Sequence, residues 1–155
     1  MNFEESLKNL SAEEIFIKGV CYLYKFGVME EDYEKAMLCF IKAMELGNIR
    51  AMAEIGTMYD YGYGVIENKV EAVKWYKRGA ELGDTEAINS LAECFIHGNG
   101  IEKNIETGIS WYIKSAKLGN RQALLMLQYY FELPEIASKY EGAFELNEKI
   151  SESKK

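Results

Sequence analysis

The chain has 155 residues, of which 48% are hydrophobic and 28% are charged, an ordinary balance for one folded domain. The formal net charge of -7 argues against nucleic acid or an anionic membrane as a partner and permits a basic protein partner. No apolar run approaches the length of a transmembrane helix, and residues 1–5 have neither the basic nor the apolar region of a signal peptide. We therefore expect a cytoplasmic protein, which we take to be a monomer.

The first long helix is expected just after Ser11, because the segment Ser11-Ala12-Glu13-Glu14 has the pattern of a capping box. Residues 2–10 are compatible with a short helix before it. A second helix is expected to follow the N-cap Asp32 and to end at Gly47. These two helices would form an antiparallel hairpin.

The same two-helix pattern returns along the chain. A period of 36 residues relates WYKRGAELGD (75–84) to WYIKSAKLGN (111–120). In the earlier copy, CYLYKFG (21–27) stands 35 residues before GTMYDYG (56–62), so the first connection is predicted to be one residue shorter. A fixed period in this range is the sign of a solenoid of stacked hairpins.

The predicted fold is all-α, a right-handed α/α superhelix of about three helix-turn-helix repeats of 36 residues within a single domain, 1–155. Asn68 and Asn104 stand at the N-cap of the later second helices, as Asp32 does in the first copy. Near the end, YEGAFELNEK (140–149) echoes YEKAMLCFIK (33–42) with a more polar face, as the end of a solenoid requires. The expected divisions are repeats at about 15–50, 51–86 and 87–122, a degenerate C-terminal capping hairpin at 123–150 and a frayed tail at 151–155.

Small and large residues alternate in these repeats at helical spacing. Small residues such as Gly56 let helix axes approach, and large ones fill the gaps between hairpins. On this basis Trp75 and Trp111 are predicted to be core residues and not a platform for a ligand. Gly108 stands where an alanine is usual and is expected to weaken its helix by about 1 kcal/mol.

The segment from AMAEIGTMYDYGYGV, through the cap Asn68, to KVEAVKWYKRGAELGD resembles the Sel1-like repeat family, a branch of the tetratricopeptide-like α-solenoids. The resemblance covers about residues 15–131. The first copy departs from the pattern, with Cys21 in place of the usual glycine and Cys39 in place of the tryptophan. The resemblance implies a protein–protein adaptor in signalling or assembly, often in bacteria.

The sequence contains no recognisable active site. The three cysteines, Cys21, Cys39 and Cys94, are irregularly spaced and are expected to be reduced and packed as small apolar side chains. The single histidine, His97, has no partner at ligand spacing, so we predict no catalytic residue, no metal and no cofactor. A closed pocket that gathered His97, Glu93 and a cysteine would instead favour an enzyme.

A solenoid usually binds its partner on the concave surface, which the first helix of each hairpin lines. Placing Gly56 and Tyr59 toward the packed side leaves the opposite residues of these helices in the groove. Aromatic side chains on that face are the expected anchors, and its carboxylates would steer a basic partner. The predicted partner-binding residues are Lys18, Tyr22, Lys25, Thr57, Asp60, Tyr61, Asn89, Glu93, His97 and Tyr129.

We therefore predict a non-enzymatic module that binds a protein or peptide. A narrower hypothesis, which rests on size and charge alone, is an inhibitor or immunity protein that blocks a bacterial toxin. The alternative is an enzyme or small-ligand binder, because the resemblance extends to relatives linked to cell-wall fragments or β-lactams.

Overall fold

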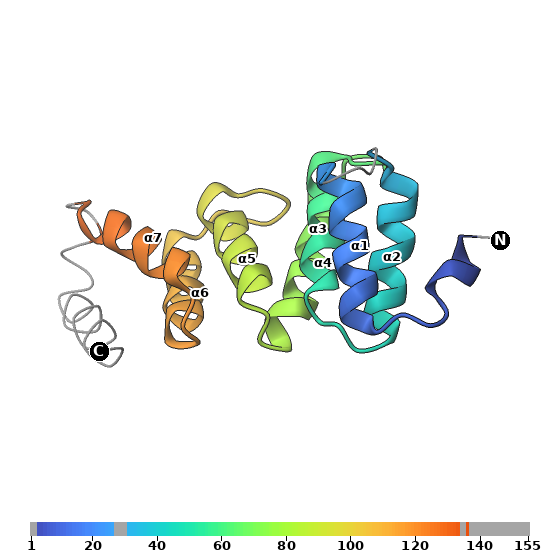
Figure 1. The fold of residues 1–155 in the computed structure, drawn as a ribbon. Coiled ribbons are helices and arrows are strands. Elements are labelled where there is room, and N and C mark those ends of the chain that lie inside the picture. The colour runs from blue at the N-terminus through green and yellow to red at the C-terminus, as the bar shows by residue number, and fades with distance from the viewer. Residues whose placement is uncertain (1–2, 27–30, 134–135, 137–155) are drawn as a thin grey trace.

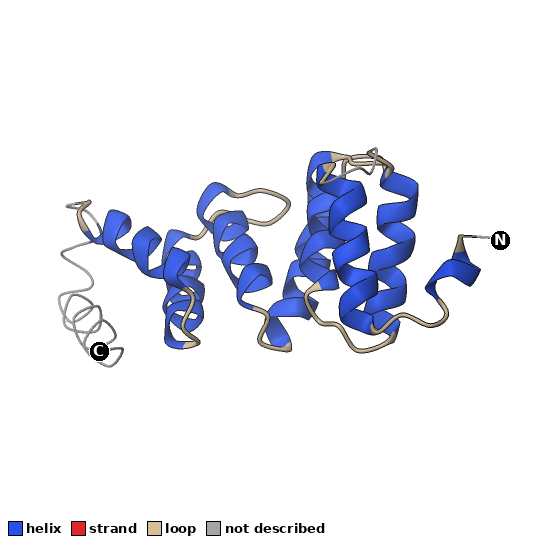
Figure 2. Cartoon of the chain, viewed as in Figure 1, coloured by secondary structure: helices blue, strands red, loops and turns tan. Residues whose placement is uncertain are grey.

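Helices make up all the regular structure in the part of the chain that the computed structural model describes, residues 3–26, 31–133 and 136 (Figure 2). The all-α repeat fold predicted from the sequence is confirmed. No helix in this part is both long enough and apolar enough to cross a bilayer. The elements are a short 3-10 helix, η1 (Glu4–Leu7), and the helices α1 (Ala12–Tyr24), α2 (Tyr33–Glu45), α3 (Ala51–Tyr61), α4 (Lys69–Glu81), α5 (Thr85–His97), α6 (Ile105–Lys117) and α7 (Arg121–Phe131).

The helices stack in chain order, as Figure 1 shows from α1 and α2 to α7. Within each hairpin α1 packs on α2, α3 on α4 and α5 on α6, and each second helix also packs on the first helix of the next hairpin. Each hairpin therefore packs within itself and against the hairpins next to it in the chain, as in a solenoid. The capping hairpin predicted at 123–150 begins within α7, whereas its residues beyond 133, apart from 136, and the predicted tail at 151–155 lie outside the described residues.

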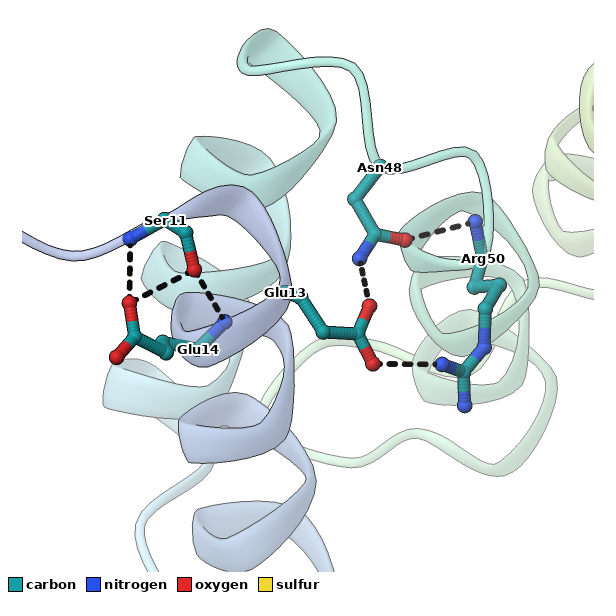
Figure 3. A network of polar contacts seen from close by, with 5 residues as sticks. All are labelled: Ser11, Glu13, Glu14, Asn48 and Arg50. Carbon is teal, nitrogen blue, oxygen red and sulfur yellow. Dashed lines mark hydrogen bonds and ion pairs between the residues drawn. The ribbon is translucent and has the colours of Figure 1, made fainter.

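The predicted helix starts are confirmed. The side chains of Asp32, Asn68 and Asn104 each accept a hydrogen bond from the backbone N–H three residues later, at the start of α2, α4 and α6. Ser11 and Glu14 form a complete capping box at the start of α1 (Figure 3). Because these side chains satisfy backbone groups that the helix leaves free, they fix where each helix begins.

The link between the first and second hairpins is held by Glu13 of α1, which reaches the connection between α2 and α3 (Figure 3). Its carboxylate accepts hydrogen bonds from Asn48 Nδ2 and Arg50 Nη1, both at 2.9 Å. Glu86 repeats this contact between the third hairpin and α7, accepting from Asn120 Nδ2 at 3.1 Å. In both places, a glutamate in the first turn of one helix is bonded to residues just before a first helix of a following hairpin.

The register predicted for the first repeat needs correction. A Cβ added to Gly56 would lie 2.5 Å from Tyr76 Cε1, so the glycine lets α3 approach α4 closely. In the first hairpin the same contact is made by Gly19, whose added Cβ would lie 2.7 Å from Phe40 Cε1. Gly19, and not Cys21, is the counterpart of Gly56, so the first connection is longer and not shorter than the others.

Of each Trp-Tyr pair in α4 and α6, the tyrosine fills the core and the tryptophan does not. Tyr76 is 2% exposed and Tyr112 is fully buried, whereas Trp75 and Trp111 are only partly buried. Arg78 lies over the Trp75 ring, with its Cζ 4.5 Å from the centroid. The tryptophans therefore lie at the edge of the core, each with a cationic side chain over its ring. The helical period alone could not tell these partly buried tryptophans from the buried tyrosines.

Candidate protein-interaction site

A hollow of about 460 Å³ runs along one side of the stack, where the first helices of successive hairpins lie. One of the residues that line it comes from α1 and one from α7, and most of the others come from α3 and α5. The hollow therefore crosses repeat boundaries and exists only in the assembled stack. It is lined by Tyr24, Thr57, Asp60, Tyr61, Tyr76, Glu86, Asn89, Ser90, Glu93, Cys94, Asn99 and Gln122.

The end of α3 and the close packing of α3 on α4 place two tyrosines in the hollow. Gly62 adopts a positive φ of 71° and ends α3, so Tyr61 stands in its last turn and is 61% exposed. Tyr76 reaches the hollow past Gly56, and its hydroxyl oxygen lies 3.4 Å from Thr57 Oγ1. Burial raises the pKa of Tyr76, so its hydroxyl stays protonated and can donate.

Asp60 is neutralised within the chain. Lys69 Nζ lies 3.0 Å from Asp60 Oδ1 and also donates to the Asp60 backbone carbonyl. In the next repeat the corresponding positions hold Ile96 and Ile105, so this ion pair has no counterpart there. Asp60 is therefore a weaker source of negative potential for a partner than the sequence suggested.

Glu86 and Glu93 supply the remaining negative charge of the hollow. Neither forms an ion pair with any other residue that the structure describes, and both are exposed. Glu93 Oε1 accepts a hydrogen bond from the Tyr112 hydroxyl at 3.2 Å, and Glu86 accepts one from Asn120. Since a carboxylate can accept about four hydrogen bonds, each keeps free acceptor capacity toward the hollow.

Half of the predicted partner-binding residues meet in this hollow, namely Thr57, Asp60, Tyr61, Asn89 and Glu93. The residues predicted from the first repeat do not line it. Lys18 and Tyr22 instead contact Phe3, whose ring centroid lies 5.4 Å from Lys18 Nζ and 5.8 Å from the Tyr22 ring.

Three other predicted residues also lie outside the hollow. Lys25 is the C-cap of α1, with a left-handed φ of 54°. His97 is the exposed last residue of α5. Tyr129 is 58% exposed and packs edge-on against Tyr130. The register shift in the first repeat explains the positions of Lys18, Tyr22 and Lys25.

The sequence-based prediction missed several lining residues, and the corrected register recovers one of them. With Gly19 aligned on Gly56, Tyr24 takes the place of Tyr61. Its hydroxyl donates to Glu54 at 3.1 Å, which ties the first and second hairpins together. The others that were missed are Tyr76, Glu86, Ser90, Cys94, Asn99 and Gln122.

The arrangement that would favour an enzyme does not form among the described residues. Glu93 and Cys94 line the hollow, but His97 does not. Burial raises the pKa of the Cys94 thiol to about 12, so at neutral pH it is a thiol and a poor nucleophile. Within the described ranges no group of three or more His, Cys, Asp or Glu side chains is placed to hold a metal ion.

Comparison with solved structures supports the repeat architecture. A Sel1 repeat protein from Oxalobacter formigenes is 34% identical, with a TM-score of 0.75, over 81% of this chain and 49% of that one. The protective antigen c5321 of uropathogenic Escherichia coli, which displays an SLR fold, is 29% identical with a TM-score of 0.70 over 83% of this chain and 27% of that one. The chain thus spans about half of the first relative and about a quarter of the second.

Helicobacter pylori cysteine rich protein B shares the fold at 18% identity, with a TM-score of 0.63, over 81% of this chain and 94% of that one. No curated protein sequence matches the chain. The family model of the Sel1 repeat matches three successive segments, residues 19–48, 49–84 and 85–120. These segments cover more than half of the chain and include α3 to α6 in full, and the protein therefore belongs to the Sel1 repeat family.

Proposed function

We propose that this protein is a non-enzymatic interaction module that binds a segment of a basic protein partner in the hollow along α1, α3, α5 and α7. Sel1 repeat proteins generally act in protein–protein interaction, which makes a protein the expected class of ligand. The observation that carries the proposal is the lining of the hollow. It combines tyrosines and carboxylates, and none of the described residues that line it is Lys, Arg or His.

The chemistry of the hollow favours a cationic partner. The Tyr61 and Tyr24 side chains offer large and fairly rigid contact surfaces, which is typical of anchor residues in interfaces. Glu86 and Glu93 add negative potential, and the whole chain carries a net charge of -7. Long-range attraction would raise the association rate, and this contribution would weaken as salt rises.

In the cell we propose the role of a monomeric, cytoplasmic adaptor. A narrower form of the proposal is an inhibitor or immunity protein that blocks a bacterial toxin, for which the small size and acidity of the chain are the support. In both roles the same surface is used. Hydrolysis of a cell-wall fragment or a β-lactam is less well supported, because the Cys94 thiol is held protonated and His97 lies outside the hollow.

A photo-crosslinking amino acid tests the location of the interface. Placed at Ser90 in the hollow, it should crosslink one specific protein in cells, whereas the same group at the exposed Lys74 of α4, outside the hollow, should not. Mass spectrometry identifies the crosslinked protein, which then serves as the purified partner. Crosslinking from Lys74 and not from Ser90 would place the interface on the opposite side and contradict the proposal.

With that partner in hand, titration calorimetry measures the contribution of the hollow. Replacing Tyr61 and Glu93 together by Ala should weaken binding by at least about 2 kcal/mol, while the melting transition stays within about 1 kcal/mol of wild type. The matched control replaces the exposed residues Ile66 and Glu102 by Ala, which removes one apolar and one acidic side chain outside the hollow. Equal losses in the two variants would rule out the hollow as the binding surface.

A further inference from the structure

One acceptor in the hollow is buried and unused. Asn89 is only 4% exposed, yet its Oδ1 has no hydrogen-bond partner among the described residues. A buried polar atom of this kind costs about 1–3 kcal/mol when it stays unpaired. Asn89 lines the hollow, so a ligand whose binding shifts the neighbouring side chains can supply the missing donor.

The orientation of the Asn89 amide is fixed by its neighbours. Asn120 Oδ1 accepts from the Ala123 backbone N–H at 3.0 Å, and that group can only donate. Asn120 Nδ2 therefore points the other way, where it donates to Thr85 Oγ1 and to Glu86 Oε1. Asn89 must then donate its own Nδ2 to Asn120 Oδ1, at 3.1 Å, which leaves Asn89 Oδ1 as a free acceptor.

Two glutamates flank Asn89 along α5. Glu86 and Glu93 lie three residues before and four residues after Asn89 on α5, and these spacings put all three on one face of the helix. Neither glutamate is ion-paired within the described part of the chain, and both line the hollow. Tyr61 and Tyr76 contribute aromatic rings to the same lining.

We propose that this hollow is a receptor for a single arginine side chain of the partner protein, a deepening that rests on the proposed function. The guanidinium group donates to Asn89 Oδ1 and to the carboxylates of Glu86 and Glu93. A guanidinium is planar and has five N–H donors, so it can serve several separated acceptors and stack on a tyrosine at the same time. A lysine ammonium is a compact, strongly hydrated charge and cannot match that spread of acceptors.

Short peptides test the inference on the full chain labelled with 15N. The probe is acetyl-Gly-Arg-Gly-amide, and the comparison peptide carries citrulline, which has nearly the same shape and no charge. We expect the arginine peptide to shift the Asn89 side-chain amide and the Ser90 backbone amide in a saturable manner. The citrulline and lysine peptides should bind at least about tenfold more weakly, because they lack the charge or the planar fork.

Three variants connect the binding to the named groups. Asn89→Leu removes the buried acceptor, and the next repeat already carries leucine, Leu125, at this position. Glu93→Gln keeps the size and removes the charge, and Glu81→Gln makes the same change at an exposed position outside the hollow. The first two should weaken the arginine peptide at least about tenfold, and the third should leave its affinity unchanged.

Several results would overturn the inference. These are equal affinity for arginine and citrulline, full affinity in both Asn89→Leu and Glu93→Gln, and shifts confined to residues outside the hollow. Free agmatine that bound as tightly as the peptide would overturn the choice of a peptide side chain. Crosslinking of a protein from Ser90 without any preference for arginine would refute the arginine receptor and leave the proposed function standing. Arginine selectivity of the peptides without crosslinking of any protein from Ser90 would show an arginine site in the hollow and contradict the proposed function.

Discussion

Gly108 gives the sharpest test of how tightly the hairpins pack. A Cβ added there would lie 2.8 Å from the backbone carbonyl oxygen of Ala92 and still closer to Ile96 Cγ1. The sequence alone suggested that this glycine merely weakens α6. In the structure it is instead the residue that allows α6 to lie directly against α5, so Gly108→Ala should destabilise the protein.

The size of the effect follows from two opposing contributions. Replacing a helical glycine by alanine gains about 1 kcal/mol of intrinsic helix stability. Forcing an extra methyl group into a packed interface costs about 1–3 kcal/mol. Because the Ala92 oxygen belongs to the backbone and cannot rotate away, the helices themselves must separate, so we take about 2–3 kcal/mol for this cost. The expected net loss in the free energy of unfolding is therefore about 1–2 kcal/mol.

Urea unfolding followed by circular dichroism measures this loss as a lower midpoint with an unchanged slope. Ser110→Ala is the control on the same helix, because Ser110 is exposed and its hydroxyl donates to the Thr107 carbonyl of the same helix at 2.6 Å. That variant should stay within about 0.5 kcal/mol of wild type. A Gly108→Ala protein more stable than wild type would refute the close approach of α5 and α6.

Two further predictions concern stability. Tyr76→Ala should cost about 3–5 kcal/mol and Trp75→Ala clearly less, because only the Tyr76 ring is fully enclosed; equal losses in thermal melts would contradict this difference. Burial also raises the pKa of Asp84, so the folded protein holds this proton to higher pH than the unfolded chain and gains stability as pH falls through that pKa. Asp84→Asn, which keeps the cap to the Ala87 N–H, should therefore be at least as stable as wild type at neutral pH, and melts taken down to about pH 4 should show that advantage shrinking.

The helix boundaries were predictable because the signals that set them are local. Asp32, Asn68 and Asn104 each cap the helix that begins at the next residue, so a short stretch of sequence holds all the information. The first-repeat register was not predictable in this way. Gly19 and Cys21 are both small enough to pass for the close-contact residue, and only the position of the Phe40 ring decides between them.

Only part of the hollow was predictable, for a related reason. Residues on α3 and α5 follow the regular period, and the helical offsets placed Thr57 and Glu93 correctly on the same side. Its other features depend on contacts between residues about one repeat apart, such as Asn89 with Asn120 or Tyr24 with Glu54. No pattern within a single repeat indicates which partner such a side chain meets.

The N-terminal ends of α3, α5 and α7 differ in the contacts that hold them in place. α5 and α7 begin with side-chain caps from Asp84 and Asn120, and Asp84 is 6% exposed. α3 has no side-chain cap; before it, Asn48 Oδ1 accepts from the Arg50 backbone N–H at 3.1 Å, and Glu13 binds Asn48 and forms an ion pair with Arg50, in which both charged side chains are 54% exposed. An exposed ion pair of this kind contributes only about 0–1 kcal/mol. The first two hairpins are therefore held together mainly by the apolar core that Ala51, Ile55 and Met58 of α3 share with α1 and α2, so substitutions in that core and not at the ion pair should set how readily the two hairpins separate in amide exchange.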